Sequence, residues 1–307
     1  MRIAVVGAGG VGGYFGGRLA ASGADVTFVA RGAHLEAMRT RGLRIESARG
    51  DLHVHRVNAT DDASAIGTVD AVLVAVKLYD VEAVARTLPP LVGPDTVVVP
   101  FQNGVDAVDM LSTAVGRTHL AGGVAYVAAV IAEPGVIRHT VMDHLLFGEL
   151  DGSRSPRLER LLKACEAAGF QATLSDRITL DIWSKFVRLS AFSGMTAATR
   201  LPIGPLRDDG DVWAMFQAAI LEGMAVARGK GVALPANVFD ETRAMAQAMP
   251  PQSKSSMLGD LERGRRLELP WLSGAIVRIG HEVDVETPIH RFLTTILKPY
   301  VNGRPQP

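Results

Sequence analysis

The chain has 307 residues, 48% of them hydrophobic, and its 32 lysines and arginines balance 32 acidic side chains. This length and hydrophobic content can bury two domain cores, and the zero net charge does not suggest a nucleic-acid surface. The single cysteine, Cys165, excludes an intramolecular disulfide and fits a reducing, cytoplasmic compartment, and no apolar run is long enough to span a bilayer.

The chain opens with an apolar strand, Arg2 to Val6, that runs through a glycine-rich turn into a helix, Val11 to Ser22. The turn has the pattern Gly-x-Gly-x-x-Gly at Gly7, Gly9 and Gly12. In a dinucleotide-binding loop the first glycine permits the tight turn, the second lets a pyrophosphate approach, and the third lets the helix pack closely on the strand. The position between strand and helix favours this interpretation over a glycine-rich turn in an unrelated α/β fold. The cofactor-binding residues expected here are Gly7, Gly9, Gly10, Val11 and Gly12.

The second predicted strand, Asp25 to Ala30, ends beside the position that discriminates between cofactors. An acid about 20 residues after the glycine motif would hold the ribose 2′-hydroxyl of NAD, but the chain has Arg31 there. A guanidinium suits a 2′-phosphate, so the sequence favours NADP, although a solvated loop arginine is the alternative.

The order of the predicted elements divides the chain into two halves. In the first half strands alternate with helices, which predicts a mainly parallel sheet and a Rossmann-type domain over residues 1–175. Within that half, 136–139 and 144–148 are expected to pair as a hairpin, followed by a helix at 156–168 and a strand at 170–174. The second half has only helical spacing, which predicts an all-α substrate and catalytic domain over residues 176–307. Its expected helices are 177–199, 212–228, 237–248, 256–264, 271–281 and 290–300.

Two polar residues follow predicted strands of the first half. Lys77 ends the apolar run from Val69, and Asn103 follows the run from Val97. Ligands of open parallel sheets bind outside the carboxyl ends of the strands, so both residues are expected to face the nucleotide. Lys77 would neutralise phosphate charge, and the Asn103 amide would donate to and accept from cofactor or substrate. The alternatives are a solvated loop lysine and ordinary turn chemistry.

Lys185 is the candidate acid of the helical half, because it lies inside an apolar stripe of the helix predicted at 177–199. Burial would lower the pKa of its ammonium group, which favours proton transfer near neutral pH. The alternative is structural, an ion pair with Asp181 one turn earlier.

Three further polar residues lie near predicted helix starts. Lys254 and Ser256 offer an amine and a hydroxyl suited to a substrate carboxylate, although a serine N-cap is the simpler interpretation of this segment. Glu268 precedes Pro270 and could bind a ribose, anchor the lysine or only complement a helix dipole. The histidines show no metal-ligand spacing, so no metal site is expected.

Together these residues resemble the ketopantoate reductase (2-dehydropantoate 2-reductase) family over nearly the whole chain. The resemblance depends on the glycine loop with Arg31, Val76-Lys77, Gln102-Asn103-Gly104, Trp183-Ser-Lys185, Ser255-Ser256-Met257-Leu-x-Asp260 and Glu268. It implies a Rossmann domain, an all-α domain, and NADPH reducing a branched 2-oxo acid in the cleft between them.

The resemblance also implies a role for each matching residue. Lys185 would be the general acid, and Asn103 would lie by the nicotinamide and substrate. Ser256 would bind the substrate carboxylate, and Glu268 would support cofactor and active site. Arg31 and Lys77 would hold the adenosine phosphate end.

Three departures from the family pattern concern the substrate. The best-known members have asparagines where this chain has Leu189, Ser193 and Ser253, all in or beside the expected substrate pocket. Loss of such hydrogen bonds can change the preferred substrate, so Ser193 and Lys254 are candidate contacts for a different acid. An opine-type or other 2-hydroxy-acid dehydrogenase and a non-catalytic NADP sensor remain alternatives. The apolar helix at 212–228 is either a homodimer seam or domain core.

Overall fold

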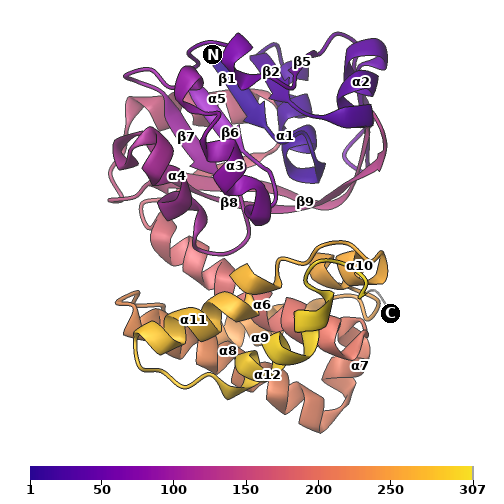
Figure 1. Ribbon diagram of the computed structural model, residues 1–307, viewed down its shortest axis with the longest axis vertical. Coiled ribbons are helices and arrows are strands. Elements are labelled where there is room, and N and C mark those ends of the chain that lie inside the picture. The colour runs from indigo at the N-terminus through magenta and orange to yellow at the C-terminus, as the bar shows by residue number, and fades with distance from the viewer. Residues whose placement is uncertain (306–307) are drawn as a thin grey trace. The chain divides into compact units, whose positions relative to one another are not determined.

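The computed structural model describes residues 1–305, and the chain forms two compact units. The first unit comprises Met1–Gln102 and Asp106–Ile178, and the second comprises Asn103–Val105 and the chain from Thr179 onward (Figure 1). The sequence-based division between 175 and 176 assigned Asn103–Val105 to the first domain, but their contacts are with the second unit. The order of predicted elements along the chain does not reveal that these three residues belong to the other unit.

A five-stranded parallel sheet forms the nucleotide-binding half of the first unit, in the order β5-β2-β1-β6-β7. Strands β6 (Ala71–Val74) and β7 (Val97–Pro100) are buried along their whole length, as strands covered on both faces are. This arrangement confirms the predicted Rossmann-type fold. The strands are β1 (Arg2–Val6), β2 (Asp25–Val29), β5 (Asn58–Thr60), β6 (Ala71–Val74) and β7 (Val97–Pro100). The helices of this part are α1 (Gly10–Ala21), α2 (Gly32–Arg41), α3 (Val81–Ala85) and α4 (Ala107–Val115), with short 3-10 helices η1 (Ala63–Ala65), η2 (Leu78–Asp80), η3 (Pro89–Leu91) and η4 (Arg117–His119).

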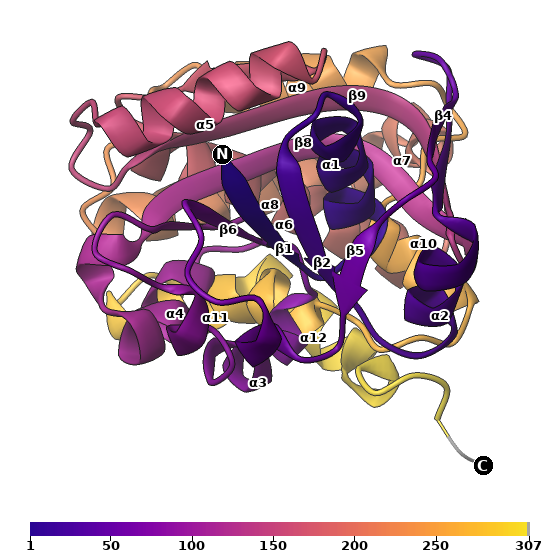
Figure 2. The ribbon, with the colours of Figure 1, turned by 90° about the horizontal axis from the view of Figure 1, so that it is seen from above.

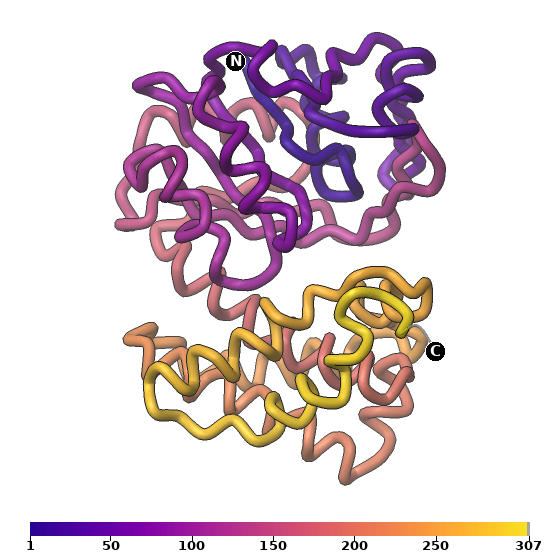
Figure 3. The backbone as a smooth tube through the Cα atoms, in the orientation of Figure 1, coloured from indigo at the N-terminus to yellow at the C-terminus, as the bar shows by residue number. Residues whose placement is uncertain are grey.

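The second sheet has the order β10-β9-β3-β4, with β8 paired to β9. Its strands are β3 (Leu43–Ser47), β4 (Leu52–Val54), β8 (Ala121–Glu133), β9 (Val136–Glu149) and β10 (Gln171–Leu174). The predicted hairpin between 136–139 and 144–148 is wrong, because both segments belong to β9 and pair with β8 (Figure 3). The interruption is a bulge in one long strand, where the register shifts near Ala128 and Met142 has a φ of 60°.

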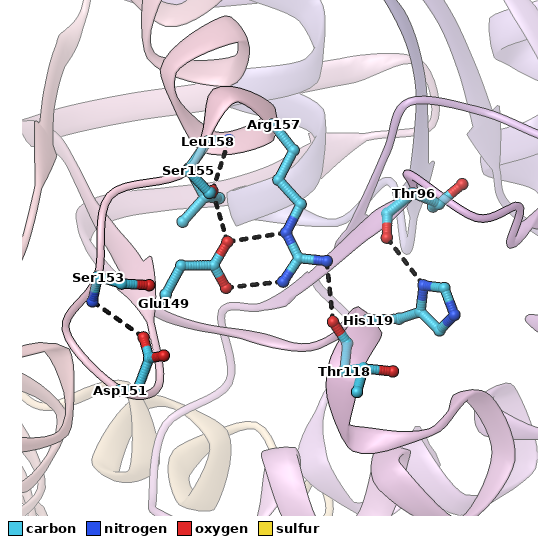
Figure 4. A network of polar contacts seen from close by, with 9 residues as sticks. All are labelled: Thr96, Thr118, His119, Glu149, Asp151, Ser153, Ser155, Arg157 and Leu158. Carbon is cyan, nitrogen blue, oxygen red and sulfur yellow. Dashed lines mark hydrogen bonds and ion pairs between the residues drawn. The ribbon is translucent and has the colours of Figure 1, made fainter.

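Helix α5 (Pro156–Ala167) covers this second sheet and lies along β9 and β10 (Figure 2). Its start is fixed by Arg157, which donates from Nε and Nη2 to the two carboxylate oxygens of Glu149 at 2.8 and 2.7 Å (Figure 4). Ser155 caps the helix and also donates to Glu149. Cys165 is fully buried on the inner face of α5, where it packs as a small core residue, and burial raises the pKa of its thiol to about 12.

The described elements of secondary structure in the second unit are all helices, as predicted. Its long helix α6 (Ile178–Thr199) carries Lys185. The short helix α7 (Ile203–Asp208) was not predicted. The other elements are α8 (Gly210–Gly229), α9 (Val238–Ala248), α10 (Ser256–Glu262), η5 (Leu269–Trp271), α11 (Ser273–Glu282), α12 (Pro288–Leu297) and η6 (Lys298–Tyr300). None of the helices over residues 1–305 combines the length and hydropathy needed to cross a membrane.

Candidate active site

The glycine loop joining β1 to α1 has the geometry that its three spaced glycines predict. Gly7 has a φ of 100°, a conformation that favours glycine at the turn. A Cβ on Gly9 would meet no atom within 4 Å, so its backbone is open to an approaching group. A Cβ on Gly12 would collide with the carbonyl oxygen of Gly7, which shows how closely α1 packs on the turn. The loop therefore fits a dinucleotide pyrophosphate.

Gly10 is required for a different reason. A Cβ at this position would collide with the backbone carbonyl of Ala129 in β8. Strand β8 thus packs directly against the first turn of α1, and the fold itself excludes a side chain at Gly10.

Arg31 precedes α2 as its N-cap residue, and its side chain is 85% exposed. Its Nη2 donates to Oδ2 of Asp80 at 3.1 Å. The sequence correctly shows no acid directly after β2, but the fold supplies one from the turn after β6. Lys77 lies three residues before this acid and is the N-cap residue of η2.

Lys185 is half-buried on α6. Burial lowers the pKa of its ammonium group from 10.5 to about 8. The negative charge of Glu268 partly opposes this effect, and the positive charge of Arg188 adds to it. The lowered pKa of Lys185 agrees with the expectation from the apolar stripe. The ion pair with Asp181 stays a prediction.

Glu268 immediately precedes η5 and is only 5% exposed. Its Oε2 accepts a long hydrogen bond from Nδ2 of Asn103, with 3.5 Å between the two atoms. Since its charge also acts on Lys185, the second unit brings together three predicted residues from widely separated segments. An amide, a carboxylate and an ammonium with a lowered pKa are suited to bind and protonate a carbonyl compound.

The residues on either side of Asn103 explain how it reaches this position. Gln102 donates from Nε2 to the carbonyls of Val74 and Val76, both at 3.0 Å, which ties the end of β7 to the end of β6. Gly104 has a φ of 95°, and a Cβ there would lie 2.8 Å from the carbonyl oxygen of Trp271. Turn chemistry and close backbone approach therefore act together in this segment.

Ser255 is the N-cap of α10, since its Oγ accepts from the backbone N–H of Leu258 at 3.0 Å. The simpler interpretation of this serine is therefore right. The same Oγ lies 2.7 Å from Oγ1 of Thr196, which links α10 to α6. Sequence reasoning missed Thr196, although it lies about three turns beyond Lys185 and thus near the same face of α6.

The two remaining predicted residues of this segment lie at its surface. Ser256 is the first residue of α10 and is exposed. Lys254 is also exposed, and its Nζ lies 2.6 Å from Oε1 of Glu262. A substrate carboxylate would compete with Glu262 for this lysine.

The positions that depart from the family pattern differ in character. Leu189 is half-buried and packs against the apolar cluster that contains Trp183 and Phe186. Ser193 is fully buried, and its Oγ has no hydrogen-bond partner among the described residues. Ser253 is half-buried, and its carbonyl accepts from the N–H of Ile203. Ser193 thus offers a buried hydroxyl that no described protein group uses.

Other possible sites are poor candidates. Across residues 1–305, no group of three or more His, Cys, Asp or Glu side chains is placed to hold a metal ion. A pocket of about 330 Å³ on the first unit is lined by residues of the segments 148–158 and 174–176. It contains none of the predicted site residues.

The chain is similar to known proteins over most of its length. Residues 3–152 match the family described as ketopantoate reductase PanE/ApbA, and residues 177–301 match the C-terminal domain of that family. A 2-dehydropantoate 2-reductase from Mesorhizobium japonicum is 33% identical, with 94% of each chain covered. Another from Archaeoglobus fulgidus is 32% identical, with 98% of each covered. The crystal structure of a PanE/ApbA family ketopantoate reductase from Ralstonia eutropha has a TM-score of 0.90 at 35% identity and covers 98% of both chains.

Proposed function

Because the chain belongs to the ketopantoate reductase family, we propose that it uses NADPH to reduce ketopantoate or a related branched 2-oxo acid to the 2-hydroxy acid. Membership of the family makes the chain an oxidoreductase acting on CH–OH groups and supports a nicotinamide cofactor and a 2-oxo acid substrate. The observation that carries the proposal is the Lys185 ammonium, whose pKa is lowered toward neutrality beside the buried Glu268.

Lys185 is the proposed general acid. With a pKa of about 8 it is mostly protonated at pH 7, so it can give a proton to the oxygen of the substrate carbonyl. When bound, the cofactor supplies the hydride that the carbonyl carbon accepts. The charge of Glu268 favours the ammonium form, which keeps the acid charged despite its burial.

The other predicted residues bind and orient. Asn103, held beside Glu268, is proposed to contact both nicotinamide and substrate. Ser256, Lys254 and Ser193 are the proposed substrate contacts, the first two for a carboxylate. Gly7, Gly9, Gly10, Val11 and Gly12 would surround the pyrophosphate, Arg31 and Lys77 the adenosine phosphate end, and Glu268 would also support the cofactor.

Leu189 favours a second candidate within the same chemistry. It places an apolar side chain where the best-known family members have an amide, which suits a 2-oxo acid with a less polar side chain. An opine-type or other 2-hydroxy-acid dehydrogenase, or an NADP sensor without turnover, are the alternatives that the assay must exclude. A homodimer, a cytoplasmic location and a place in pantothenate biosynthesis are further parts of the proposal.

The test is oxidation of NADPH in the presence of a panel of 2-oxo acids that includes ketopantoate. We expect Lys185→Ala to lower turnover at least about a hundredfold while NADPH binding stays nearly unchanged, the scale of general-acid catalysis. Lys298→Ala, at an exposed lysine of the same unit, is the matched control. Saturable NADPH binding without oxidation by any acid would favour the sensor, and unchanged turnover of Lys185→Ala would refute the proposed acid.

A further inference from the structure

Asp80, an acid that the glycine motif does not predict, lies beside Arg31, the residue expected to distinguish NADP from NAD. Arg31 follows β2, and Asp80 ends the 3-10 helix η2 that follows β6. The guanidinium Nη2 and the carboxylate Oδ2 are 3.1 Å apart. The Arg31 side chain is 85% exposed, whereas that of Asp80 is only 29% exposed. The arginine is thus held by a carboxylate on the surface where a 2′-phosphate would bind it.

We propose that Asp80 is a specificity-determining residue that weakens the preference of this chain for NADPH over NADH. The inference rests on the proposed function, because it assumes that Arg31 receives the 2′-phosphate. A phosphate that approaches Arg31 competes with the Asp80 carboxylate for the guanidinium and is repelled by the negative charge of that carboxylate. NADH meets no such competition at the ribose, and a carboxylate can also accept hydrogen bonds from ribose hydroxyls.

A purely structural role for Asp80 predicts something different. Asp80 stands at the N-terminus of α3, where an acid complements the helix dipole, although its side chain makes no capping hydrogen bond. A helix-stabilising acid would affect both cofactors equally. A competitor for Arg31 affects only the ligand that carries a 2′-phosphate, so the ratio of two affinities separates the roles.

The experiment is calorimetric titration of the whole protein with adenosine 2′,5′-bisphosphate and with AMP, which differ only in the 2′-phosphate. We expect Asp80→Asn to bind the bisphosphate about twofold to fivefold more tightly and AMP as tightly as wild type, because exposed charge pairs are worth up to about 1 kcal/mol. Fluorescence titration with NADPH and NADH should show the same selective gain. The gain should shrink at high salt, where surface charges are screened.

Asp109→Asn is the matched control. It removes an equal charge from the exposed ion pair with Arg117, at 2.9 Å on the same unit, and should leave both affinities unchanged. In an Arg31→Gln background, the selective effect of Asp80→Asn should shrink, since only the repulsion between Asp80 and the phosphate is left to relieve. An unchanged bisphosphate-to-AMP affinity ratio in Asp80→Asn would overturn the inference and leave the proposed function intact. If wild type binds neither nucleotide, the proposed cofactor is contradicted and the inference falls with it.

Discussion

Replacement of Lys185 by methionine is expected to stabilise the second unit and abolish turnover. Methionine keeps the length of the side chain but removes the charge that burial disfavours. Lowering the lysine pKa from 10.5 to about 8 corresponds to about 3 kcal/mol of unfolding free energy, at 1.36 kcal/mol for each pH unit. Because the side chain is only half-buried, a gain of about 1 to 3 kcal/mol is expected at pH 7.

The sign of the effect can be followed with pH. Below pH 8 the lysine is charged in both the folded and unfolded states, so the wild type bears the full cost of burying it. Between pH 8 and 10.5 only the unfolded lysine keeps its proton, and the stability of the wild type therefore rises with pH. The advantage of Lys185→Met should be complete at pH 7 and vanish near pH 10.5.

Urea unfolding followed by tryptophan fluorescence suits this test. All three tryptophans of the chain, at 183, 213 and 271, lie in the second unit, so their emission reports its unfolding separately. Lys298→Met, at an exposed lysine of the same unit, should show no comparable gain. A Lys185→Met variant that is no more stable than wild type at pH 7, or whose advantage persists above pH 10.5, would refute the reasoning.

Three other predictions follow from the same structure. Reduction of the 2-oxo acid should slow about tenfold per pH unit above pH 8, where Lys185 loses its proton; a flat profile of kcat/KM to pH 10 would contradict its role. Burial lowers the pKa of His290 to about 4, so its protonation on unfolding should cost the protein about 3 kcal/mol of stability as pH falls from 6.5 to 4. Urea titrations should show this loss in wild type and not in His290→Gln measured against its own value at pH 7. Gly12→Ala should disrupt folding of the first unit, whereas Gly9→Ala should fold, as judged by circular dichroism, and bind NADPH more weakly in a fluorescence titration.

The features predicted correctly are those that neighbouring residues encode. The glycine loop lies within six residues of sequence, and the position of each glycine in the motif predicts its steric role. The stripe that contains Lys185 is likewise a property of one helix, and its burial follows from helical periodicity. Buried parallel strands also have continuous apolar sequences, so the Rossmann-type sheet could be predicted from the sequence.

The features that escaped prediction depend on pairing between distant segments. Arg31 meets Asp80 across 49 residues, and no local pattern identifies that carboxylate as its partner. The sequence around Met142 was predicted to be a turn between two strands but forms a bulge within one strand, because both features interrupt the alternation of a strand in the same way. Thr196 and Ser255 make an interhelical contact that periodicity on either helix alone cannot reveal.

The excursion of Asn103–Val105 into the second unit has a consequence for the order of assembly on the ribosome. Asn103 is synthesised 165 residues before its partner Glu268. At translation rates of about 5–20 residues per second, this segment waits roughly 8 to 33 s for that partner. The first unit can therefore complete its own strands while Asn103 still lacks its partner Glu268. The candidate active site forms only after most of the chain has emerged.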